Sequence, residues 1–241
     1  GSTTRIFGMN HKYFFNERTS SAVSLASSKA KNRNTIETES PTNPNQFEQT
    51  FDGNSTQIKT TINWAINSKI HSRNLIKIGA NPDFYQLRVL DTALVNNSFW
   101  YREKDFNGSL GLYRLFGQWE YKFSDKLKMN TGINTLFLDL NNSWTVEPRF
   151  KLSYIMDDKN VIALACGKYS QMQPLPIYFS NDVNATPEEN ALNKELDFIK
   201  SDHYVLSYTH HFTNKLRLQL ETYYQDLSSI AVDPKQGAFS A

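Results

Sequence analysis

The segment Trp144–Met156 restricts the possible folds more than any other part of the chain. Its even positions are apolar or proline, and its odd positions are Thr, Glu, Arg, Lys and Ser, with Ile155 as the exception. Because successive side chains of a β-strand point to opposite faces, the pattern predicts one apolar and one charged face. The run extends over roughly 40 Å, whereas strands in soluble sheets usually have about five or six residues. A tilted strand that crosses an outer membrane fits this length.

The composition excludes several other classes of protein. The chain has 241 residues, a net charge of +2 and 13% aromatic residues, with a mean hydropathy of −0.55. A negative mean is compatible with a barrel, because half of each strand faces a polar lumen. No run of about 18 apolar residues occurs, which excludes a membrane-spanning helix. Scattered Lys and Arg do not suggest nucleic acid as a partner, and the lone Cys166 excludes a disulfide or a cysteine metal cluster.

Similar alternation recurs along the chain and predicts about ten strands. We expect them at residues 4–15, 20–28, 56–66, 75–78, 113–123, 127–138, 144–156, 161–169, 203–212 and 216–224. Short turns at 16–18, 124–126, 157–160 and 213–215 alternate with long connections at 29–53, 94–107 and 171–200. The first long connection is so polar that we expect a mobile loop. Short turns at one end and long loops at the other are typical of outer-membrane barrels.

The predicted fold class is therefore all-β, an antiparallel up-and-down transmembrane β-barrel with about ten strands present. We expect residues 1–241 to form a single β-barrel domain. A soluble up-and-down β protein is the alternative, and it is less favoured because soluble barrels seldom need strands of this length.

Several segments resemble a known family. Val146–Tyr154 (VEPRFKLSY), the turn Asp158–Asn160 and Ala165–Gln171 (ACGKYSQ) resemble successive barrel strands of TonB-dependent receptors, in particular those of the Bacteroidetes type. Lys200–Tyr208 (KSDHYVLSY) and Glu221–Leu227 (ETYYQDL) are similar to strands in the C-terminal part of such barrels. The resemblance covers about residues 144–232, and its motifs say nothing about a ligand.

The resemblance implies an outer-membrane receptor and transporter that takes up a scarce nutrient through a plugged barrel. The nutrient could be a siderophore, cobalamin, a glycan or a peptide. Implied partners are outer-membrane lipid, a surface lipoprotein and the TonB complex, which would act through a plug domain; no cofactor is implied. Such receptors have barrels of about 22 strands, and no segment here reads as a plug, so we expect part of a larger barrel. A small closed barrel that acts as a passive pore or adhesin remains an alternative, as does a soluble carbohydrate-binding β domain.

Aromatic residues in the long connections are the candidate ligand contacts. They are Phe99, Trp100, Tyr101, Tyr178 and Phe179. Exposed aromatic rings can stack on sugars or flat chelates. The alternative for the first three is a girdle at the membrane boundary, and the alternative for the last two is packing within their loop.

Charged residues on the polar strand faces are expected to set the polarity of the lumen. They are Lys59, Arg114, Glu120, Arg149, Lys151 and Arg217. Glu147 and Arg149 lie two residues apart on one face, which predicts a structural ion pair rather than an acid–base pair.

We predict neither catalysis nor a metal site. Asp202 and His203 form the best candidate pair for an outer-membrane protease. His210 and His211 are neighbours and so point to opposite faces of a strand, where they cannot jointly bind one metal ion. Ser201 has no Gly-x-Ser-x-Gly context.

Overall fold

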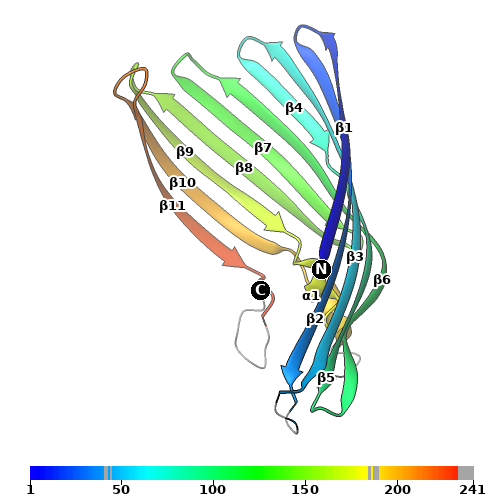
Figure 1. Cartoon of the computed structure of the whole chain (residues 1–241). Helices are drawn as coiled ribbons and strands as arrows, with labels where there is room; N and C mark the ends of the chain where they lie inside the picture. The colour runs from blue at the N-terminus through cyan, green and yellow to red at the C-terminus, as the bar shows by residue number, and fades with distance from the viewer. Residues whose placement is uncertain (41–42, 44, 184–185, 187–189, 233–241) are drawn as a thin grey trace.

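A computed structural model of the protein describes residues 1–40, 43, 45–183, 186 and 190–232, and these form one antiparallel sheet (Figure 1). Apart from one interrupted crossing, neighbours in the sheet are neighbours in sequence, as in an up-and-down barrel wall. The predicted all-β antiparallel fold is confirmed. The strands are β1 (Ser2–Asn16), β2 (Thr19–Glu39), β3 (Phe47–His71), β4 (Asn74–Ala80), β5 (Asp83–Val95), β6 (Phe99–Lys122), β7 (Leu127–Leu138), β8 (Ser143–Ile155), β9 (Asn160–Gln171), β10 (Ile199–His211) and β11 (Arg217–Ser228).

Strands β4 and β5 are two halves of one crossing. Both lie between β3 and β6, and the register is the same on either side of the interruption, with Trp64 opposite Ala80 and Thr61 opposite Asp83. The interruption falls at Pro82, which has no N–H to donate to a neighbouring strand. The Pro82 carbonyl still accepts a hydrogen bond from Ile62 N at 3.0 Å. The described sheet therefore has ten crossings, which agrees with the predicted number.

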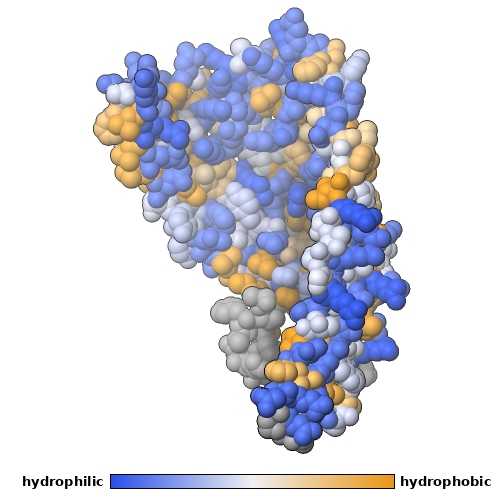
Figure 2. Space-filling view, in the orientation of Figure 1, coloured by the Kyte–Doolittle hydropathy of each residue, from blue (hydrophilic) through white to orange (hydrophobic). Residues whose placement is uncertain are grey.

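The two faces of the sheet differ in polarity as the alternation predicts. On β8, Trp144 lies on the outer face and is 68% exposed, whereas Glu147 lies on the inner face and is 1% exposed. The concave face that is visible between the sheet edges is mostly hydrophilic (Figure 2). Near the long-loop end, the outer face carries Phe84, Tyr113, Phe137 and Trp144, which we call the outer aromatic belt. The ring of Tyr113 contacts both Phe84 and Phe137, and such belts mark membrane boundaries.

The expected mobile loop at 29–53 is mostly strand, so this prediction was wrong. Strand β2 continues to Glu39 and β3 begins at Phe47, with paired residues along the whole extension. A polar composition excludes a strand only where the strand needs a buried face. A hairpin that extends beyond the apolar band has water on both sides, and its ladder hydrogen bonds satisfy the backbone without a core.

The expected long loop at 94–107 is also wrong, because this segment is a tight hairpin between β5 and β6. Asn96 and Asn97 both have positive φ, 50° and 53°, and Ser98 N donates to the Val95 carbonyl at 3.0 Å. Asparagine tolerates this left-handed conformation better than most residues. An Asn-Asn pair is thus a turn signal inside what looked like an aromatic loop.

The third long connection, 171–200, is confirmed as a loop, and it folds back over the sheet. It contains the short helix α1 (Leu175–Tyr178) and the 3-10 turn η1 (Leu192–Glu195). Tyr178, Phe179 and Phe198 of this connection pack on the inner face of β5, β6 and β7 and form the hydrophobic core there. The core residues are Tyr85, Leu87, Leu110, Leu112, Leu136, Leu138, Tyr178, Phe179 and Phe198. None of the helices in the described part of the chain is long and apolar enough to cross a membrane.

All four predicted short turns join strands at the opposite end of the sheet (Figure 1). In the β8–β9 turn, the Asp157 carboxylate accepts hydrogen bonds from the Asn160 side chain and from the backbone N–H groups of Lys159 and Asn160. These hydrogen bonds lower the pKa of Asp157, and the bond from the Asn160 side chain contributes most to this shift.

This turn gives a prediction for the pH dependence of stability. Because the folded pKa is depressed, its stabilisation is fully present above the unfolded value of about 3.9 and is lost as pH falls through the folded value. The stability difference between the parent and Asp157→Asn should therefore be largest near neutral pH and shrink in acid. Denaturant unfolding of both proteins across this pH range measures it, and a constant difference would contradict the prediction.

Candidate functional site

The long β9–β10 loop docks onto a free edge of β6. Because β7 ends at Leu138, the first part of β6 has no strand neighbour on that side. The loop pairs with this edge through a bridge between Lys104 and Ser180. Asn181 N donates to the Glu103 carbonyl at 2.7 Å, so the loop replaces part of the missing ladder.

Two aromatic side chains anchor the loop beneath its surface. Phe179 is 4% exposed and stacks on Phe106, with 3.7 Å between the ring centroids. Tyr178 is fully buried, and its hydroxyl oxygen accepts a hydrogen bond from Gln173 N at 3.2 Å. Burial raises the pKa of Tyr178, so this hydroxyl stays neutral at physiological pH. The anchors place the polar residues that follow in the loop beside the edge of β6.

Two polar side chains fasten the base of the loop. The buried Gln173 amide donates to the carbonyls of Asp197 at 3.1 Å and Ser229 at 2.9 Å. Asn141, in the β7–β8 turn, donates to the carbonyls of Lys194 and Leu196, each at 2.9 Å. The loop is therefore tied to the segments before β8 and after β11.

A cavity of about 480 Å³ lies where the loop meets β6. We call it the loop pocket. Its lining combines aromatic rings with charged and amide groups, which is a composition suited to a small polar ligand with a flat portion. The lining residues are Tyr101, Arg102, Asp105, Tyr178, Phe179, Asn181, Val183, Asn190, Ala191 and Lys194.

The polar groups of the loop pocket are only partly committed to other contacts. The Tyr101 hydroxyl donates to the Asp182 carbonyl at 3.0 Å, which fixes its ring. Arg102 forms an ion pair with Asp105 at 2.7 Å, but its side chain is exposed, so the pair is weak in water. Lys194 is exposed and has no ion pair among the described residues. The pocket can therefore offer two cationic groups to an anionic ligand.

The structure brings together three of the five aromatic residues that the sequence suggested. Tyr101, Tyr178 and Phe179 all line the loop pocket, whereas Phe99 and Trp100 lie near the β5–β6 turn, 50% and 48% exposed, and do not. Sequence reasoning missed Arg102, Asp105, Asn181 and Lys194. No local pattern marks them, because they meet only after the loop folds back.

The inner wall contains the ion pair that the sequence predicted, between a buried Glu147 and a partly exposed Arg149. Glu147 and Arg149 are 2.6 Å apart. The second carboxylate oxygen of Glu147 accepts a hydrogen bond from Ser170 N at 2.6 Å, close to where β8–β9 pairing stops. Pairing stops beside Pro148, which has no N–H, so the carboxylate replaces a ladder bond there. Arg149 also lies over the ring of Tyr169, 4.1 Å from its centroid.

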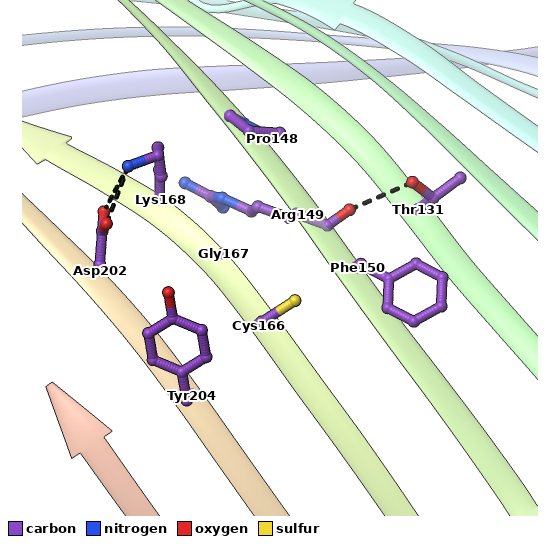
Figure 3. A pocket seen from close by; sticks show the side chains of 9 residues that line it. All are labelled: Thr131, Pro148, Arg149, Phe150, Cys166, Gly167, Lys168, Asp202 and Tyr204. Atoms are coloured by element: carbon purple, nitrogen blue, oxygen red, sulfur yellow. Dashed lines mark hydrogen bonds and ion pairs between the residues drawn. The ribbon is translucent and has the colours of Figure 1, made fainter.

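Asp202 and His203 do not form a catalytic pair. Asp202 lies on the outer face, where it accepts a hydrogen bond from Lys168 at 2.8 Å (Figure 3). His203 lies on the inner face with its ring 4.5 Å from that of Tyr169. His210 is hydrogen-bonded to Asn160 at 2.7 Å. In the described ranges, no three His, Cys, Asp or Glu side chains are grouped in a way that could hold a metal ion.

Comparison with known proteins gives matches among solved structures. No family model matches the sequence, and no curated protein matches it. The ferric enterobactin receptor PfeA from Pseudomonas aeruginosa superposes with a TM-score of 0.69 at 12% identity, over 94% of this chain and 35% of its own.

Two further receptors superpose equally well. The ferric-catecholate import receptor Fiu from E. coli has a TM-score of 0.68 at 11% identity over 99% of this chain. The copper transporter OprC has a TM-score of 0.68 at 9% identity over 93% of this chain. The chain spans 42% of the Fiu chain and 38% of the OprC chain. It therefore has the fold of part of the β-barrel wall of these receptors.

Proposed function

We propose that this chain forms part of the barrel wall of a TonB-dependent outer-membrane receptor that takes up a scarce nutrient. The observation that carries the proposal is the loop pocket, which lies at the long-loop end of the wall beside the hydrophobic core. Two supports come from elsewhere: the receptor fold, and an apolar outer face bounded by the outer aromatic belt. The narrower Bacteroidetes-type assignment rests on the sequence motifs alone.

The proposed mechanism follows from this arrangement. Ligand enters from the long-loop side and binds in the loop pocket against Tyr101 and the cationic groups of Arg102 and Lys194. The polar inner wall then provides a hydrated path along the lumen. Release through the barrel would need a plug domain and the TonB complex, which are the partners that the family resemblance implies.

The loop pocket favours an anionic chelate among the nutrients considered. Two exposed cations beside an aromatic ring suit a flat ligand with negative charge, such as a ferric catecholate. The similar solved structures include receptors described as binding ferric enterobactin and importing ferric catecholates. For this chain, the ligand class is part of the proposal.

Binding measurements on the whole detergent-purified protein test the proposal. The ligands to compare are a ferric catecholate, cobalamin, an oligosaccharide and a peptide. We expect the ferric catecholate to bind most tightly. The double variant Tyr101→Ala with Lys194→Ala should weaken that binding at least tenfold, which corresponds to about 1.4 kcal/mol. Isothermal titration calorimetry gives both affinities.

The matched control is Phe99→Ala, which removes a more exposed aromatic ring near the β5–β6 turn and outside the loop pocket. It should leave the affinity unchanged. Equal losses in both variants, or no ligand of any class for the parent, would count against the proposed site. A protein that stays monodisperse without detergent would count against the membrane assignment itself.

A further inference from the structure

Strands β2, β3, β5 and β6 continue past the rest of the sheet at the long-loop end (Figure 1). One line of directly paired residues crosses this extension. Ile36 of β2 is opposite Phe51 of β3. Phe51 is in turn opposite Ala93 of β5, and Ala93 is opposite Tyr101 of β6. Residues that are directly opposite in an antiparallel sheet place their side chains on the same face. We call these four residues the apolar row.

The apolar row faces the inside of the wall. Ala93 is on the same face of β5 as the core residues Tyr85 and Leu87, because even spacings along a strand keep side chains on one face. Both faces of the extension meet water, so neither a core nor a membrane explains why its inner face is apolar at this level. The paired residues on the opposite face are all polar, and they are Thr35, Asp52, Thr92 and Arg102.

The apolar row is accessible to a ligand. Ile36 is 47% exposed, and the other three side chains are half-buried. The Phe51 ring lies against Gly53, where a Cβ atom would be only 2.8 Å from the ring carbon Cε1. Any larger residue at position 53 would displace the ring from the surface of the sheet. The glycine therefore lets the Phe51 ring lie along β3 as part of the row.

Charged and polar groups limit the width of the apolar row. On one side, Asp91 is opposite Gly53 and forms an ion pair with Lys104 at 2.9 Å. On the other side, Glu37 and Gln49 form the next pair along β2 and β3. Four partly exposed side chains in one row cannot provide the roughly 800 Å² per partner that a stable protein interface needs. A single extended hydrocarbon chain fits this narrow surface.

The apolar row leads directly into the loop pocket, because Tyr101 belongs to both. From Tyr101 to Ile36 the row covers three strand-to-strand steps, which is about 14 Å. The cationic groups of Arg102 and Lys194 lie in the loop pocket, at the Tyr101 end of the row. A charged region and an apolar region thus follow one another in a single direction, as the two parts of an amphiphilic molecule do.

We propose that the ligand of the loop pocket is amphiphilic, with an anionic head in the pocket and a hydrocarbon chain along the apolar row. The inference rests on the proposed function, since the head is the chelate that the loop pocket binds. The chain displaces water from Phe51 and Ala93 and ends near Ile36, where the row ends. A fully buried methylene strengthens binding about fourfold, so a chain that is covered on one side gains about twofold per methylene.

The first test uses the whole protein in amphipol and a series of ferric catecholates that carry a butanoyl, octanoyl, dodecanoyl or hexadecanoyl chain on the same head. An extended dodecanoyl chain has about the length of the apolar row. Isothermal titration calorimetry should show that the affinity rises about twofold per methylene up to dodecanoyl and then levels off. This series needs no variant, so it does not depend on how a substitution affects folding.

The second test removes the apolar row with the double variant Ile36→Thr, Phe51→Thr, which keeps β-branched residues in the strands. The double variant should bind the dodecanoyl chelate at least about tenfold more weakly and the butanoyl chelate like the parent. The matched control is Leu90→Thr with Leu94→Thr, which removes two apolar side chains from the outer face of β5. It should bind the whole series like the parent. Partition of the chain into amphipol is the same for all three proteins and cancels in the comparison.

Several results would overturn the inference. An affinity that continues to rise from dodecanoyl to hexadecanoyl would contradict it, because that result indicates partition rather than a row of fixed length. Equal affinities of the parent and the double variant for the dodecanoyl chelate would contradict it as well. If the butanoyl chelate binds the parent and longer chains add no affinity, this inference fails and the loop-pocket proposal stands. If no chelate of the series binds the parent, the proposed function fails first.

Discussion

Replacing Glu147 with alanine should lower the free energy of unfolding by about 3 kcal/mol. The carboxylate is almost fully buried, binds Arg149 at 2.6 Å and accepts the Ser170 N–H at 2.6 Å. Its loss leaves a backbone donor without a partner in a gap of the β8–β9 ladder. It also leaves a partly exposed guanidinium without its counter-charge, and this exposure keeps the effect below that of a fully buried pair. Denaturant unfolding of the detergent-solubilised protein measures the change.

The comparison variant for this prediction is Glu120→Ala. Glu120 is also on the inner face and pairs with Lys128 at 2.9 Å, but it is more exposed and replaces no ladder bond. Its removal should cost less than about 1 kcal/mol. Glu147→Gln should fall between the two, because an amide oxygen can still accept from Ser170. If both alanine variants lost the same stability, the structural role assigned to Glu147 would be wrong.

Replacing Phe179 with alanine should release the long loop from the wall. The ring is buried and stacks on Phe106 at 3.7 Å, and deletion of such a ring typically costs about 3–5 kcal/mol. Because the loop opens locally, this loss appears mainly as faster opening of the loop rather than as global unfolding. Hydrogen exchange at Asn181 N, which donates to the Glu103 carbonyl, should accelerate by more than about 100-fold.

The control for the loop is again Phe99→Ala, which removes a ring that is half exposed. Exchange at Asn181 should then stay at the parental rate. The loop pocket should lose its ligand in Phe179→Ala and keep it in Phe99→Ala. An unchanged exchange rate in Phe179→Ala would show that the loop is held by its hydrogen bonds alone.

The crossing strands could be predicted from the sequence because their alternation is enforced along the whole length. Each residue of Trp144–Ile155 faces either the apolar outer side or the polar inner side, so a single misplaced side chain would be costly. The ion pair of Glu147 and Arg149 followed from the same alternation. The same alternation places Asp202 and His203 on opposite faces, and this excludes the pair that was named as the best catalytic candidate.

The extensions of the hairpins could not be predicted in the same way. Beyond the apolar band, both faces of β2 and β3 meet water, so the alternation that marks a crossing strand is not required there. The strands persist because the ladder satisfies the backbone, and this leaves no hydrophobic signal. In the β5–β6 hairpin, the turn depends on the left-handed conformation of Asn96 and Asn97. The alternation of polar and apolar residues does not reveal this conformation.

The loop pocket was predictable only in part, for a related reason. Aromatic residues in loops draw attention, and Tyr101, Tyr178 and Phe179 do line the pocket. Two of them are buried, so they shape the pocket from beneath, which matches the expectation of packing within the loop. The cations Arg102 and Lys194 are far apart in sequence and meet only through the edge pairing of the loop.

The Gln173 side chain has a consequence for energetics at the long-loop end. Its amide hydrogens bind the carbonyls of Asp197, where the loop returns to β10, and Ser229, where the chain leaves β11. The β9–β10 loop and the segment after β11 are separated in sequence by the β10–β11 hairpin, and both are attached to Gln173. Their free energies are therefore not independent, and substitutions in the two connections should show thermodynamic coupling rather than additive effects. A ligand that shifts one of them would change the conformational equilibrium of the other.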